Sequence, residues 1–310
     1  MKVSGSKPRR RRSLGLLCGL LGRTRQAYYG HFREEEREAG EAGLLIGEVL
    51  RIRSEQRRIG GRKLYFMLGG FIAEHGLRIG RDGFFDLLRE HGLLVRRRRS
   101  RRVRTTYSCY WMKRYANLAK WFMPEGANRL WVSDITYLRL KEGFAYLSLI
   151  TDAYSRKIVG YRLGPDLTAR WSIAALEMAL RSNPAREALI HHSDRGMQYY
   201  SAGYMKLLAK AGVRISMSEK SDPLENAIAE RVNGILKQEL LERRFTSFEE
   251  AKEEVDRAVG IYNNLRPHLS CDLLTPAEAH LRTGELTRRW KNYHPGANRG
   301  PVPVLDQAMA

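Results

Sequence analysis

The order of secondary-structure elements expected between residues 128 and 240 constrains the fold of this chain more than any other feature. Five segments rich in apolar and β-branched residues, bounded by Gly, Asp or Ser turns, predict strands. They are residues 129–140, 143–152, 155–164, 188–193 and 213–218. Segments with helical periodicity follow at residues 168–182, 201–212 and 224–240. The order β-β-β-α-β-α-β-α predicts an α/β layer of three antiparallel strands, with two more strands added through crossovers.

Positive charge is concentrated in the front third of the chain. The net charge is +21, and residues 1–120 hold 29 Lys and Arg against 11 Asp and Glu, whereas the other 190 residues hold 26 against 23. Arginine supplies most of this charge, and its planar guanidinium pairs well with phosphate. We therefore expect the front third to bind nucleic acid. The arginines expected to track a phosphate backbone are Arg96, Arg97, Arg98 and Arg99.

A first helical pair is expected within residues 13–33. Ser13 and Thr24 can cap two short helices that meet at a turn on Gly22, and this outline is typical of a helix-turn-helix. The acidic stretch REEEREAGE, at residues 33–41, is expected to separate this pair from the next one.

A second helical pair is expected within residues 42–95, where apolar residues recur at helical spacing on both sides of the turn GLRIG. It also has the outline of a helix-turn-helix. Arg78 and Arg81 lie at the start of its second helix, so they are expected near phosphates or base edges.

The cysteines and the absence of a long apolar run bear on the compartment. Cys18, Cys109 and Cys271 are widely spaced and form no C-x-x-C pair, which favours a reducing compartment and argues against structural zinc. The stretch KPRRRRSLGLLCGLLG resembles a signal peptide, but no small-residue cleavage site follows it. We expect a cytoplasmic protein with no membrane partner.

Three carboxylates are candidates for binding a hard cation, which prefers oxygen ligands. Asp134 lies in mid-strand among apolar neighbours, Asp194 ends a strand, and Glu230 belongs to a polar helical stripe. Each also has a simpler interpretation: an edge-strand residue, a turn aspartate, and an exposed glutamate paired with a neighbouring cation. Glu225 lies on nearly the same side of the helix and is a rival ligand. The full stripe is Asn226, Glu230, Asn233 and Lys237.

Two histidines precede Asp194 and raise the question of a histidine metal site. His192 lies two residues before Asp194 and shares its face of the strand, whereas His191 points to the other face. Because Mg²⁺ prefers oxygen, we expect His192 to be a packed or hydrogen-bonded neighbour and the loss of His191 to do little.

The numbers of residues between the three carboxylates form a pattern that relates them to one another. Between Asp134 and Asp194 lie 59 residues, between Asp194 and Glu230 lie 35, and Lys237 follows Glu230 by seven. With this spacing the chain resembles the IS-three family of bacterial insertion-sequence transposases, which are related to retroviral integrases. The blocks that carry the resemblance are WVSDITYL, HHSDRGMQY, DPLENAIAERVNGILKQE and YNNLRPHLSCDLLTP, and it covers roughly residues 13–282.

The resemblance implies an α/β fold with an RNase H-like catalytic core of the retroviral integrase type, preceded by all-α helix-turn-helix segments. It implies that Asp134, Asp194 and Glu230 are catalytic and hold two Mg²⁺ ions, with Mn²⁺ able to substitute, for phosphodiester cleavage and strand transfer. Lys237, Asn226 and Asn233 would contact DNA. The partners implied are transposon ends, target DNA, further copies in a homodimer or higher oligomer, and an upstream-frame helix-turn-helix protein, fused or paired.

The chain is expected to divide into five segments. They are a basic helix-turn-helix-like segment at 1–40, a second helix-turn-helix at 41–105, a linker at 106–125, the catalytic core at 126–245, and a C-terminal helix and tail at 246–310. Two other functions remain open at this point: a DNA-binding repressor with an inert body, and a nuclease that degrades RNA–DNA hybrids.

Overall fold

The computed structural model describes residues 14–95, 115–183, 188–219, 226–241 and 244–289. The chain divides into two compact units, residues 1–97 and 98–310, each described here by itself. Several sequence-based expectations fall outside the described residues. They concern the expected cap Ser13, the run Arg96–Arg99, the rival ligand Glu225, most of the linker and the tail beyond residue 289.

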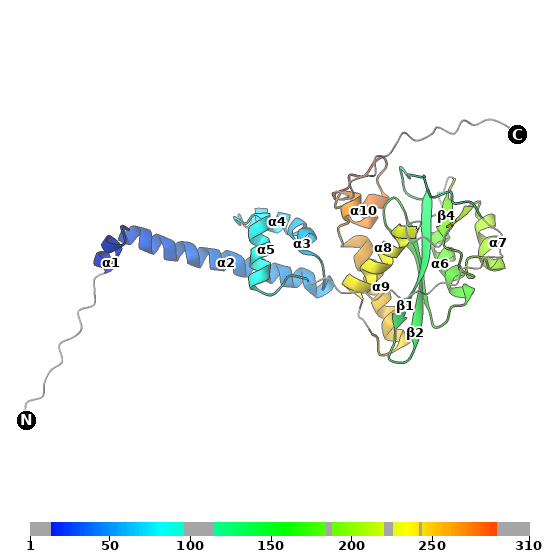
Figure 1. Ribbon diagram of the computed structural model, residues 1–310, viewed down its shortest axis with the longest axis horizontal. Helices are drawn as coiled ribbons and strands as arrows, with labels where there is room; N and C mark the ends of the chain where they lie inside the picture. The colour runs from blue at the N-terminus through cyan, green and yellow to red at the C-terminus, as the bar shows by residue number, and fades with distance from the viewer. Residues whose placement is uncertain (1–13, 96–114, 184–187, 220–225, 242–243, 290–310) are drawn as a thin grey trace, which may run out of the picture. The chain divides into compact units, whose positions relative to one another are not determined.

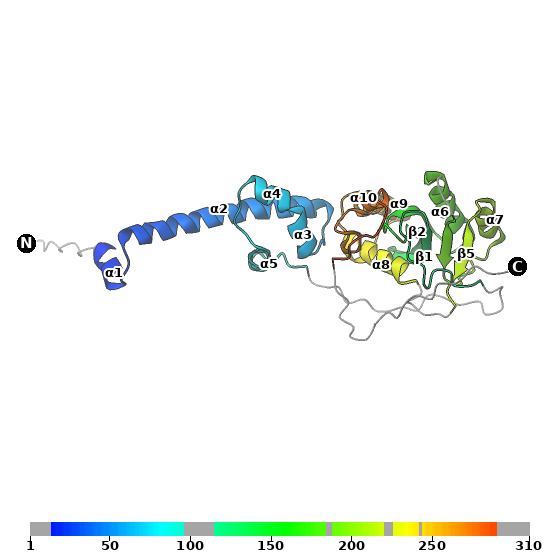
Figure 2. The same ribbon diagram turned by 90° about the horizontal axis from the view of Figure 1, so that it is seen from above.

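The first unit consists of helices alone in its described part (Figures 1 and 2). These helices are α1 (Leu14–Leu20), α2 (Arg25–Glu55), α3 (Gly61–Met67), α4 (Gly69–Glu74) and α5 (Arg81–Glu90). Leu64 and Leu68 pack with Phe84 and Leu88 in a core to which α2 contributes Leu45, Val49 and Ile52. The helical spacing therefore identified the inward side chains of the second helical pair correctly. The helix expected there is interrupted at Leu68, which separates α3 from α4.

Helix α2 differs from the expectation. Thr24 caps it as predicted, since its hydroxyl accepts a hydrogen bond from the backbone N–H of Ala27 at 3.1 Å. The helix then continues through the acidic stretch for 31 residues, so the expected boundary between residues 40 and 41 falls inside it. Arg37 forms ion pairs with Glu34 and Glu41, at the i−3 and i+4 positions, and such pairs stabilise a helix. The acidic stretch therefore extends the helix.

The second unit contains a five-stranded sheet in the order β3-β2-β1-β4-β5. Its strands are β1 (Leu130–Arg139), β2 (Phe144–Asp152), β3 (Ile158–Gly164), β4 (Ile190–Ser193) and β5 (Arg214–Met217). The first three are antiparallel neighbours, and β4 and β5 are added parallel to β1. This is the topology expected from the sequence, and it is that of an RNase H-like fold.

Helices cover both faces of the sheet, so the second unit has three layers (Figures 1 and 2). Helices α6 (Ala169–Ser182) and α7 (Ala202–Lys210) pack on one face. The other face is covered by α8 (Ala227–Ile235), its π-helical continuation η2 (Leu236–Leu240) and α9 (Phe248–Asn264). The short helices η3 (Leu269–Cys271) and α10 (Pro276–His280) complete the unit. None of the helices in the described parts of the chain is both long and apolar enough to cross a membrane.

Candidate active site

Two of the predicted ligands come from adjacent parallel strands. In the β1–β4 ladder, Val132 is paired with His192. Asp134 and Asp194 each lie two residues farther along, so they are level with each other and on the same face of the sheet. This is the face that α8 covers, because Asp134 accepts a hydrogen bond from that helix. The fold thus brings together two carboxylates that 59 residues separate in sequence.

The charges of these two carboxylates interact. Burial, together with the nearby charge of Asp194, raises the pKa of Asp134 to about 7. Hydrogen bonds from the side chain of Asn233 and the backbone N–H of Ile135 act in the opposite direction. Burial likewise raises the pKa of Asp194, although the N–H of Gly196 donates to its Oδ1 at 3.0 Å. Two neighbouring carboxylates that are hard to ionise form an electrostatic environment that attracts cations.

Glu230 lies in the first turn of α8 and is exposed to solvent. Its charge also raises the pKa of Asp134, by less than burial or the charge of Asp194 does. Within the described residues, no three His, Cys, Asp or Glu side chains lie close enough together to hold a metal ion. The structure therefore brings Asp134 and Asp194 together and leaves Glu230 beside them on the exposed side of the helix.

The rest of the polar stripe faces strand β1. The amide nitrogen of Asn226 donates to the carbonyl of Ser133 at 2.9 Å, and that of Asn233 donates to Oδ2 of Asp134 at 2.7 Å. Both asparagines are more than 90% buried. In this structure the helix presents both side chains to its own sheet, and their contact with DNA remains a prediction.

Lys237 continues this line of contacts on η2. Its Nζ donates to Oγ1 of Thr136 at 3.2 Å and lies 4.1 Å from the centre of the Tyr137 ring. Burial lowers the pKa of Lys237, and the charge of Asp134 opposes that effect. Thr136 was not identified from the sequence, although it lies two residues after Asp134 and so shares its strand face. A period of two from the candidate ligand Asp134 is the signal that could have found it.

The two histidines are structural neighbours of the site. His191 is 1% exposed, and its Nε2 lies 2.7 Å from Oγ of Ser133 and 2.8 Å from the hydroxyl of Tyr204. Burial lowers the pKa of His191 to about 3, so this ring is neutral. His192 contacts the hydroxyl of Ser216 through Nδ1 at 2.8 Å, as a hydrogen-bonded neighbour would. The burial of His191 argues against the expectation that its loss does little.

The candidate DNA contacts of the first unit are only partly described. Arg78 and Arg81 are exposed at the start of α5, as the sequence predicts. Arg81 forms an ion pair with Asp82 at 2.9 Å, whereas Arg78 lines a groove that also contains several carboxylates. Their contact with DNA remains a prediction.

Family models and relatives identify the chain. Models of the integrase core domain match residues 124–223 and 211–276, which include all three candidate carboxylates. An uncharacterized 31 kDa protein of insertion element IS600 from Shigella sonnei is 35% identical over 267 residues, covering 84% of this chain and 96% of the relative. The chain belongs to the IS-three family of insertion-sequence transposases. The family assignment makes it a polynucleotidyl transferase of the DDE class, which acts in DNA transposition.

Two transposases agree with this assignment, and one solved structure is also similar. The transposase of insertion sequence element IS629 from Shigella sonnei is 31% identical over 284 residues, covering 88% of this chain and 93% of that protein. Transposase InsF of insertion sequence IS3A from Escherichia coli is 37% identical over 159 residues, 51% of this chain and 55% of InsF. The solved catalytic core of HTLV-2 integrase, in complex with magnesium, matches 51% of this transposase and 99% of that chain, with 18% identity and a TM-score of 0.41.

Proposed function

We propose that this transposase binds the ends of an insertion sequence and catalyses Mg²⁺-dependent phosphodiester cleavage and strand transfer by a two-metal mechanism. Asp134, Asp194 and Glu230 are the catalytic ligands in this proposal, and Mn²⁺ substitutes for Mg²⁺. The observation that carries it is the position of Asp134 in β1 beside Asp194, which directly follows the adjacent parallel strand β4, where each is hard to ionise without a cation.

The donor set fits the metal. Carboxylate oxygens are the ligands that Mg²⁺ prefers, and the free-energy cost of two neighbouring ionised carboxylates falls when a divalent cation is bound between them. Glu230 is exposed in the first turn of α8, and its charge contributes to the raised pKa of Asp134, so it lies within electrostatic reach of this pair. When bound, the metal supplies activation of the attacking hydroxyl and stabilisation of the leaving oxygen.

The protein's own residues position this pair. The hydrogen bond from Asn233 orients the carboxylate of Asp134, and the N–H of Gly196 does the same for Asp194. Lys237, which is partly buried beside Thr136, places a positive charge next to the site on the same face of the sheet. That charge would attract a phosphate of the DNA backbone, so Lys237 is the DNA contact of the second unit in this proposal.

DNA ends are recognised by the first unit in this proposal. Arg78 and Arg81 lie at the start of α5, which corresponds to the second helix of the expected helix-turn-helix. The arginine run that follows α5 adds phosphate contacts. Because two ends must be joined to one target, the protein acts on DNA as a homodimer or a larger assembly, alone or with an upstream-frame helix-turn-helix protein.

The test compares matched carboxylate substitutions in the full chain. Glu230→Gln and Asp194→Asn are expected to reduce strand cleavage and transfer at insertion-sequence ends by at least about a hundredfold, because each removes a charged ligand. The control is Glu177→Gln, which changes an exposed helical glutamate on α6, a helix that covers the opposite face of the sheet. DNA binding, measured by fluorescence anisotropy, should be retained in all three variants.

A second measurement tests metal binding separately from catalysis. Calorimetric titration with Mn²⁺ should show binding to the wild-type protein and to Glu177→Gln, and binding weakened at least about tenfold in Asp194→Asn. Strand transfer at the wild-type rate by Asp194→Asn would overturn the assignment. Equal degradation of RNA–DNA hybrids without end specificity would favour a plain nuclease, and end binding with no cleavage by the wild-type protein would favour a repressor.

A further inference from the structure

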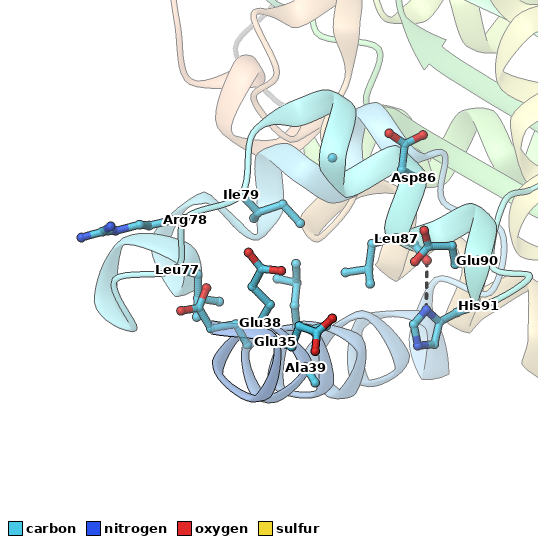
Figure 3. A pocket seen from close by; sticks show the side chains of 14 residues that line it. Glu35, Glu38, Ala39, Leu77, Arg78, Ile79, Asp86, Leu87, Glu90 and His91 are labelled. Carbon is cyan, nitrogen blue, oxygen red and sulfur yellow. Dashed lines mark hydrogen bonds between the residues drawn. The ribbon is translucent and has the colours of Figure 1, made fainter. Parts of the chain in front are cut away.

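A groove of about 570 Å³ lies in the first unit, between α2 and the segment that runs from Leu77 into α5 (Figure 3). Its apolar part includes Leu77, Ile79 and Leu87. Around them stand five carboxylates, those of Glu35, Glu38, Glu41, Asp86 and Glu90. Acidic side chains from α2 rise into the space bordered by Ile79 and Leu87 in Figure 3. We call this feature the acidic groove.

The acidity of this groove is only partly balanced. Asp86 forms an ion pair with Arg89, and Glu41 forms one with Arg37. No ion pair to Glu38 or Glu90 is present among the residues that the structure describes. An apolar groove with an acidic border suits a partner that presents apolar side chains beside positive charges.

The N-terminal hairpin, residues 14–33, has these properties. It consists of α1, the turn that follows and the first turns of α2. Its large apolar side chains are unusually exposed: Leu20 and Leu21 are each 77% exposed, Tyr29 is 54% exposed and Phe32 is 45% exposed. Residues 1–33 contain no Asp or Glu, and the hairpin itself carries Arg23, Arg25 and Arg33. Clustered exposed apolar side chains of this size mark a surface that binds a partner.

The hairpin cannot enter the groove of its own chain. Helix α2 is continuous over 31 residues and so about 46 Å long, and it carries both the first turns of the hairpin and, farther along, one wall of the groove. A straight helix holds these two parts at a fixed distance. Helix α1 has only seven residues, about 10 Å, and its Cys18 is buried. A hairpin that docks in the groove therefore comes from another copy.

We propose that the N-terminal hairpin of one copy docks in the acidic groove of a second copy, and the reverse, to form a two-fold symmetric dimer through the first unit. The contact is isologous, since each copy contributes one hairpin and one groove, and it closes without leaving either surface free for further copies. The dimer needs neither DNA nor metal, so it is independent of the catalytic proposal.

Charge reversal in the full chain tests this contact. The hairpin variant carries Arg23→Glu and Arg33→Glu, and the groove variant carries Glu38→Arg and Glu90→Arg. Each should weaken the dimer at least about tenfold in sedimentation equilibrium without DNA, because like charges then face each other in both contacts. The control is Glu74→Arg, an exposed carboxylate of α4 outside the groove, and it should leave the dimer unchanged.

Mixing the two reversed chains gives the decisive result. In a heterodimer, the acidic hairpin of one chain meets the basic groove of the other, and the unchanged hairpin meets the unchanged groove. An equimolar mixture should therefore recover the dimer that each variant alone has lost. Leu20→Ser with Leu21→Ser should also weaken the dimer, with an unchanged far-UV circular dichroism spectrum. A monomeric wild-type chain at micromolar concentration, dimers unaffected by reversal, or a mixture that stays monomeric would each overturn the proposal.

Discussion

Replacing His191 by alanine should destabilise the second unit by about 3 kcal/mol. The imidazole is 1% exposed, and it connects β4 to β1 through Ser133 and to α7 through Tyr204. The substitution leaves a cavity behind the strand that ends at Asp194. It also removes the shared partner of two hydroxyl groups, both of which belong to residues that are 1% exposed.

The magnitude follows from these two losses. Removing a large buried side chain costs about 2–5 kcal/mol, and leaving one buried polar group unsatisfied costs about 1–3 kcal/mol. We take the lower end of the second range, because the hydroxyls of Ser133 and Tyr204 share one partner atom, Nε2 of His191, and are expected to pair with each other once the ring is removed. The cavity is therefore the main contribution, which places the expected loss near the middle of its range.

The pH dependence gives an independent check on the same residue. Burial lowers the pKa of His191 from 6.5 to about 3, so below pH 6.5 the unfolded chain takes up a proton that the folded chain does not. Stability from this group is complete above pH 6.5 and is lost as the pH falls toward 3. At pH 5 the loss is about 2 kcal/mol, at 1.36 kcal/mol for each pH unit. The alanine variant lacks this group, so its deficit relative to wild type should shrink by that amount.

Urea unfolding followed by tryptophan fluorescence measures both effects. All five tryptophans, at positions 111, 121, 131, 171 and 290, lie in the second unit, so the signal reports on that unit. Unfolding curves at pH 7.5 and pH 5 provide the four free energies needed. A deficit below about 1 kcal/mol at pH 7.5, or one that does not change with pH, would refute the reasoning.

Two further substitutions, each with a matched control, test packing and charge in the same unit. Gly160→Ala should destabilise the second unit by about 1–3 kcal/mol or more, since the added Cβ would lie 2.2 Å from a backbone carbonyl oxygen of α6. The control Gly234→Ala has open space around it in α8 and should be neutral or stabilising. The reverse order of stability in thermal unfolding would contradict this packing. Arg266→Met should cost about 2–3 kcal/mol in urea unfolding, because it removes a guanidinium that is 1% exposed and pairs with Glu239 at 2.8 Å. Arg257→Met on the surface of α9 should cost under about 1 kcal/mol, and equal losses would show that burial of the first pair does not matter.

Local periodicity predicted the elements of the catalytic unit well. The alternation of apolar residues identified the strands, because side chains of a strand point to opposite faces with a period of two. The same period placed His192 and Asp194 on one face and His191 on the other, as the structure shows. Strand pairing then followed from general rules of connection, which favour short turns between antiparallel strands and helical crossovers between parallel ones.

Local pattern was insufficient where the outcome depends on what a side chain meets. The helical period grouped Asn226, Asn233 and Lys237 in one stripe, but it could not show that the stripe faces β1. Nothing local in the sequence shows that Arg266 is buried, yet the structure buries it against Glu239 at 2.9 and 3.0 Å. Polar side chains that contact the protein and those that contact DNA have the same sequence signature, because both need the same donors.

The sequence by itself determined the order of elements, the faces of the strands and the spacing of three carboxylates, since these depend on short-range periodicity and on position along the chain. The tertiary structure decided the rest: the register that sets Asp134 level with Asp194, the contact of Asn233 with that pair, and the exposure of Glu230 beside it. The physical reason is that burial and neighbouring charge control the ionisation of a carboxylate, and both arise only when distant segments pack together.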